Sequence, residues 1–121
     1  MDELIGRLVA NLGVDRATAE TAVSIILDFL VKEGPADKVR ALLAKLPGAE
    51  ELVQKAASAG AGGPSVGVGV LGAGMRLMAA GLSMEQVQTV ARDVIAYARE
   101  QAGEDAVGAV VAAIPGLAGF V

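Results

Sequence analysis

Residues 12–35 read LGVDRATAETAVSIILDFLVKEGP, which combines a helix stop, a helix start and a long helix. Gly13 lacks a Cβ and suits the left-handed conformation that closes a helix, here expected over residues 2–12. Asp15 is a favoured N-cap residue type. Residues 16–32 are then predicted to be helical, because apolar residues recur at helical spacing: Ala19, Ala22, Val23, Ile26, Phe29 and Leu30.

Two further helices are expected after this stretch. Gly34 and Pro35 end the long helix, and Pro35 fits the first turn of a third helix that runs through Leu46. Pro47 stops the third helix, and a short fourth one is expected over residues 49–57. No segment shows the period-2 alternation of a strand, so the sequence predicts an all-α fold.

The chain repeats itself after a shift of 68 positions, which places Gly6 on Gly74 and Gly13 on Gly81. The pair Pro47-Gly48 falls on Pro115-Gly116. Further identities join Thr21 to Thr89, Asp37 to Asp105, Val39 to Val107, Ala41 to Ala109, Ala44 to Ala112, and Val53 to Val121. Chance similarity between Ala-rich helices would not also align the caps and breakers, so we interpret the pattern as an internal repeat.

The second copy repeats the plan of the first. A helix reaches about Ala80 and stops at Gly81, and Ser83 with Gln86 forms a capping box for a helix to about Gln101. A last helix is expected over residues 104–114. The inward positions of the long helix are predicted to be Val87, Val90, Ala91, Val94, Tyr97 and Ala98.

We therefore expect two similar three-helix lobes. Residues 1–57 form the first repeat, 58–65 a Gly- and Ala-rich linker and 66–121 the second repeat. A unit of about 50 residues buries too little surface to fold well alone. The two lobes are accordingly expected to pack as one helical domain.

The composition excludes several functions. The chain has no His and no Cys, a net charge of -4 and 2% aromatic residues. His- and Cys-based metal sites and nucleophilic machinery are therefore absent, and a nucleic-acid surface is not expected. We predict no catalytic, cofactor-binding or metal-binding residue, and hence no enzyme.

Two patterns have structural explanations. The run from Gly67 to Gly72 matches G-x-G-x-x-G, but helix rather than strand precedes it, so we interpret it as a linker that enters a helix. Adjacent carboxylates occur in expected first helical turns, where they complement the helix dipole: Asp2-Glu3, Glu50-Glu51 and Glu104-Asp105.

The charges of the two long helices are expected on solvated faces opposite the apolar stripes. Asp28 and Lys32 have the spacing of a modestly stabilising pair. Glu85, Arg92 and Arg99 follow at seven-residue spacing on an outer face. A docking surface for an acidic partner is the less favoured alternative.

The pattern Leu12-Gly13-Val14-Asp15, long helix, Lys45-Leu46-Pro47-Gly48 resembles a group of small bacterial helical domains, the VcgC/VcgE-like family. The resemblance covers most of the chain and rests on caps and breakers. It implies an all-helical fold and a bacterial source. It implies no catalytic residues.

The second copy carries fewer charges than the first. Residues 1–60 hold seven basic and nine acidic side chains, whereas residues 61–121 hold three and five. Positions that are charged in one copy and apolar in the other are expected to be covered by a partner, an apolar ligand or the first lobe. The predicted interface residues are Val70, Leu71, Met75, Met78, Ala106, Val110, Ala113, Leu117 and Phe120.

The sequence thus favours an interaction module that binds a second copy of itself or another protein, with no cofactor. The alternative is a carrier for an apolar small molecule or lipid, held between the lobes. The acidic start Met1-Asp2-Glu3 does not resemble a signal peptide, so a cytoplasmic location is expected. Residues 65–83 are apolar but Gly-rich, which makes membrane contact a disfavoured alternative.

Overall fold

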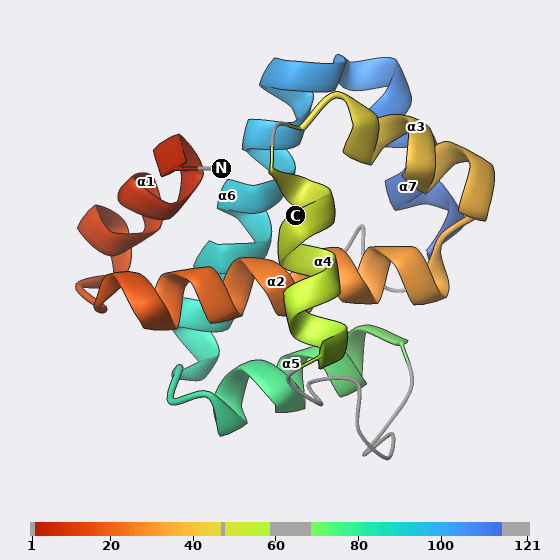
Figure 1. Cartoon of the computed structure of the whole chain (residues 1–121). Coiled ribbons are helices and arrows are strands. Elements are labelled where there is room, and N and C mark those ends of the chain that lie inside the picture. Colours follow the sequence, from red (N-terminus) through yellow and green to blue (C-terminus); the bar gives the residue numbers. More distant parts are fainter. Residues whose placement is uncertain (1, 47, 59–68, 115–121) are drawn as a thin grey trace.

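The computed structural model describes residues 2–46, 48–58 and 69–114. This part of the chain contains helices and no strand, so the all-helical prediction is confirmed for it. The helices follow in this order (Figure 1): α1 (Asp2–Leu12), α2 (Arg16–Glu33), α3 (Ala36–Ala44), α4 (Ala49–Ser58), α5 (Gly69–Ala79), α6 (Met84–Ala102) and α7 (Glu104–Ala113). The predicted linker lies mostly outside the described residues.

The two long helices begin at the predicted caps. The Asp15 carboxylate accepts a hydrogen bond from the Thr18 amide at 2.9 Å, and this bond holds the pKa of Asp15 below its usual value. Ser83 and Gln86 form the expected capping box, in which Gln86 Oε1 accepts from the Ser83 amide at 2.8 Å. Gly13 and Gly81 have φ values of +69° and +106°, as predicted for the stops before these caps.

Three helix boundaries differ from the sequence-based expectation. Pro35 is the N-cap of α3 rather than part of its first turn, since its ψ of 123° is extended. The third helix ends at Ala44, because the amides of Lys45 and Leu46 bond to carbonyls three residues back and tighten the chain. The last helix ends at Ala113, since Ile114 precedes a proline and is extended.

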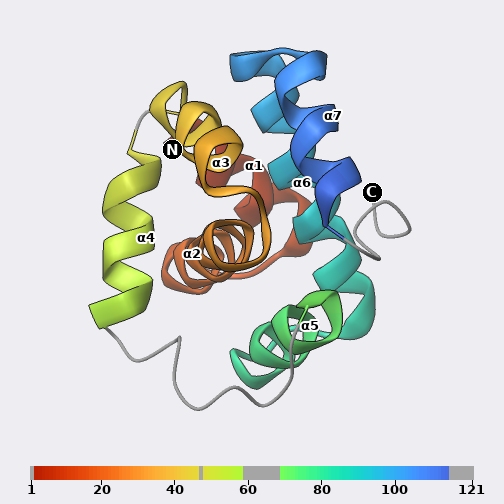
Figure 2. The same ribbon diagram turned by 90° about the vertical axis from the view of Figure 1, so that its right-hand side faces the viewer.

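Helix α2 lies at the centre of the fold. It packs against α1, α3, α4, α5 and α6, and Figure 2 shows it nearly end-on with neighbours around it. The predicted inward stripes of α2 and α6 are buried as expected. Every residue from Ala22 to Leu30 is also buried. Along this stretch α2 therefore contacts the core on all sides and not only along the predicted stripe.

The helices of the two halves exchange partners. Helix α1 packs on α6 and α5 packs on α2, while α2 also contacts α6 and α3 contacts α7. Figure 1 shows α1 beside α6 and α3 beside α7. Each half therefore supplies part of the covering of the other half's long helix.

Candidate protein interface

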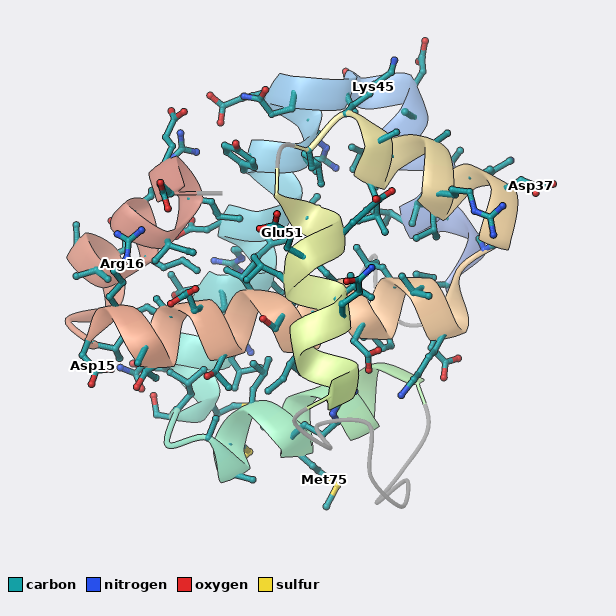
Figure 3. All side chains as sticks on the ribbon, in the orientation of Figure 1. Asp15, Arg16, Asp37, Lys45, Glu51 and Met75 are labelled. Atoms are coloured by element: carbon teal, nitrogen blue, oxygen red, sulfur yellow. The ribbon has the colours of Figure 1, made fainter. Side chains whose placement is uncertain are left out.

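Three exposed methionines lie on α5 and at the start of α6. The side chains of Met75, Met78 and Met84 are 44%, 47% and 52% exposed. In the part of the chain that the structure describes, Val31 is the one other large apolar residue with comparable exposure. Figure 3 shows Met75 pointing away from the helices. We call Met75, Met78 and Met84 the methionine face.

Two interactions hold α5 against the rest of the molecule. Leu77 is fully buried in the core. Arg76 donates a hydrogen bond to Asp28 on α2 at 3.0 Å. Arg76 is the only charged residue in the sequence of α5, so its attachment to α2 leaves the outer side of this helix without charge. An uncharged apolar surface of this kind is typical of binding sites.

Asp28 corrects the expectation that the charges of α2 lie on a solvated face. Its side chain is nearly inaccessible, because α5 covers this side of α2. The predicted pair with Lys32 is present at 3.1 Å, and Arg76 supplies a second positive charge. The Arg76 Nε atom is buried and has no hydrogen-bond partner among the described residues. A buried carboxylate needs such paired charges to offset its lost hydration.

The contact between α1 and α6 is polar at its surface. Arg7 donates to Glu100 at 2.8 Å, and Asn11 donates to Asp93 at 2.9 Å. The Arg7 guanidinium also lies 5.9 Å from the centre of the Tyr97 ring. Tyr97 is buried in the core, as predicted, and burial raises the pKa of its hydroxyl. Exposed polar groups therefore attach α1 to α6, whereas the outer side of α5 is apolar.

The described members of the predicted interface differ in their exposure. Met75 and Met78 are exposed on α5, and Ala113 is exposed on α7. Figure 1 shows α5 on one side of α2 and α7 beside α3 on the other side. Ala106 is half-buried, and Val110 is fully buried in the chain's own core, where it offers no surface to a partner.

Four further predicted interface residues have no described side chain. Val70 and Leu71 lie in the first turns of α5, and Leu117 and Phe120 lie outside the described residues. Sequence reasoning missed Met84. The shift of 68 positions pairs Met84 with Arg16, so the same comparison of charged with apolar positions could have found it.

Three further sequence features concern the acidic residues, the glycine run and the apolar helices. No group of three or more acidic residues there is placed to hold a metal ion. The G-x-G-x-x-G run reaches into α5, which begins at Gly69, and its first two residues lie outside the described ranges. None of the helices in those ranges combines the length and apolar character needed to cross a membrane.

An open hollow of about 170 Å³ lies where the end of α2 meets α3 and α4. The described residues that line it are Val31, Val39, Arg40, Leu43 and Glu50. All five lie within residues 1–57, whereas the alternative function expected a ligand between the two predicted lobes.

The described part of the chain is thus an all-helical fold with a central helix, α2, and exposed methionines on α5. Comparisons of the chain with protein-family models, with curated proteins and with solved structures gave no match.

Proposed function

We propose that the protein is a non-enzymatic helical module that self-associates through the methionine face. The exposure of Met75, Met78 and Met84, with α5 carrying no charge besides the Arg76 that pairs with Asp28, is the observation that carries this proposal. In the proposed dimer the same face of each copy contacts the other, as in most symmetric pairs. Methionine side chains suit this role because they are flexible and polarisable and adapt to a partner surface.

Charge favours a second copy meeting this face. Each copy carries a net charge of -4, so two copies repel each other. This electrostatic cost is lowest when the copies meet through a surface that carries no charge. Small residues on α5 also allow a neighbouring helix to come close. Gly74 has no atom within 4 Å of the position of an added Cβ, and Ala79 is exposed.

We also propose that the molecule is built from two copies of one three-helix unit. The helix starts at Arg16 and Met84, and those at Ala36 and Glu104, differ by the shift found in the sequence. The positive-φ glycines, the caps and the reciprocal packing of α1 on α6 and α5 on α2 support the same proposal. An experimental structure in which the two long helices have unrelated neighbours would contradict it. The same caps and breakers support the likeness to VcgC/VcgE-like bacterial domains.

Light scattering at several protein concentrations tests the self-association. The double substitution Met75→Lys with Met78→Lys places like charges opposite each other in a two-fold interface, which is expected to raise the dimer dissociation constant more than about 100-fold. Both side chains are exposed, so the helical circular dichroism is expected to stay unchanged.

Two control variants locate the interface. Val31→Lys changes an exposed apolar residue at the end of α2, and Ala113→Arg changes an exposed one on α7. Both are expected to leave the measured mass unchanged. A wild-type protein that stays monomeric at every concentration, or dissociation caused by Ala113→Arg instead, would show that the methionine face is not the interface.

A further inference from the structure

The hollow between α2, α3 and α4 has apolar walls and an open mouth. Val39 and Leu43 of α3 are buried, and Val31 of α2 is 39% exposed at the edge. The volume of about 170 Å³ is close to that of an engineered apolar cavity of about 150 Å³ that binds benzene. The space therefore suits an apolar group of about four to six carbon atoms and is too small for a lipid chain.

Two opposite charges line the same hollow. Arg40 lies on α3, and Glu50 lies in the first turn of α4. Within the described residues, neither side chain takes part in an ion pair or a hydrogen bond. An aliphatic surface flanked by an available cation and an available anion is complementary to a small ligand that carries both charges.

The fold itself does not require these charges. At the shift of 68 positions, Arg40 corresponds to Gly108 and Glu50 to Ala118, whereas Leu43 corresponds to the apolar residue Val111. Val39 likewise corresponds to Val107, and Val107 and Val111 are buried like their counterparts. The two apolar positions thus pack in the core in both halves. The two charges occur only in the first half, where they line the hollow.

We propose that this hollow binds a free α-amino acid with a branched aliphatic side chain. The side chain contacts Val31, Val39 and Leu43, the carboxylate pairs with Arg40, and the ammonium group pairs with Glu50. This site is independent of the methionine face, which lies on α5 and the start of α6. Failure of either proposal leaves the other standing.

Titration of methyl-labelled protein with L-leucine, followed by NMR, tests the site. The methyl signals of Val31, Val39 and Leu43 are expected to shift and saturate. Leucinamide lacks the carboxylate and 4-methylpentanoate lacks the ammonium group, so each is expected to bind about three- to fivefold more weakly, the range of an exposed ion pair. N-acetyl-leucinamide, which lacks both charges and mimics a leucine within a protein partner, is expected to bind most weakly.

Substitutions assign each charge to its partner. Arg40→Gln is expected to abolish the preference for leucine over leucinamide. Glu50→Gln is expected to abolish the preference for leucine over 4-methylpentanoate. Lys38→Gln and Glu51→Gln are matched controls, because these exposed neighbours carry the same charges and are not part of the lining. Both controls are expected to bind leucine like the wild type.

Filling the hollow provides a second, independent variant. Val31→Phe occupies the mouth and is expected to abolish the shifts at Val39 and Leu43, while the methyl signals of Leu8 in the core stay unchanged. The absence of saturable shifts with leucine would overturn the proposal. Equal binding of leucine and N-acetyl-leucinamide would also overturn it, because the charges would then have no role and a protein side chain would be the better occupant.

Discussion

Asp28 shows how much one residue depends on its neighbours. It is 3% exposed in the stretch of α2 from Ala22 to Leu30 that is buried on all sides, and two cations reach it, Lys32 from the next turn and Arg76 from α5. Lys32 is itself half-exposed, so Arg76 provides the more buried partner. Removing one partner of a buried ion pair costs about 3–5 kcal/mol, whereas replacing both by apolar residues is often neutral.

At this residue scale, Arg76→Leu is expected to lower the free energy of unfolding by about 2 kcal/mol, less than the full cost because Lys32 still pairs with Asp28. The double variant Asp28→Leu with Arg76→Leu is expected to stay within about 1 kcal/mol of the wild type. Urea denaturation measures both, and Arg92→Leu on the exposed side of α6 serves as a control expected within about 0.5 kcal/mol. A double variant as unstable as the single one would contradict this role of the pair.

At the scale of the element, glycine has two opposite effects on the helices. Gly81 follows α5 with a φ of +106°, a conformation that L side chains rarely adopt. Gly6 lies inside α1 in helical backbone, and no atom lies within 4 Å of an added Cβ. The first glycine is needed to end a helix, and the second weakens one.

Gly81→Ala is therefore expected to lower the free energy of unfolding by about 1 kcal/mol. Gly6→Ala, the matched change within a helix, is expected to raise it by about 0.5–1 kcal/mol. The two denaturation midpoints, measured in urea, should lie on opposite sides of the wild-type value. If Gly81→Ala leaves the midpoint unchanged, the positive φ does not contribute to stability as argued.

At the scale of the whole molecule, the exchange of partners between the halves links their stabilities. Helix α5 of the second half covers α2 of the first, and α1 of the first half covers α6 of the second. Loss of either half would expose the long helix of the other. The described helices are therefore expected to unfold as one cooperative unit.

Native-state hydrogen exchange tests this cooperativity. The amides of Leu27 in α2 and Val94 in α6, both buried, are expected to exchange with the same free energy of opening, equal to that of global unfolding. Exposed ends of α5 serve as a reference that opens more easily. Two clearly different free energies for Leu27 and Val94 would instead indicate that the halves unfold separately.

Helix starts and stops were predictable from the sequence because the groups that form them are close neighbours in the chain. Asp15 bonds to Thr18, and Ser83 bonds to Gln86, three positions away in each case. The positive φ of Gly13 and Gly81 depends on the missing Cβ alone. Such local chemistry was sufficient to predict an all-helical fold for the described residues.

The sequence by itself thus determined where the two long helices begin, and which stripes of α2 and α6 face inward. Only the tertiary structure decided that α2 is enclosed and that Asp28 is buried, because the covering α5 and its Arg76 lie 48 positions further along the chain. It also decided that α5 and α7 lie apart and that Arg40 and Glu50 meet at one hollow. Burial and proximity of this kind depend on how several helices pack together, and no local pattern encodes the packing of distant neighbours.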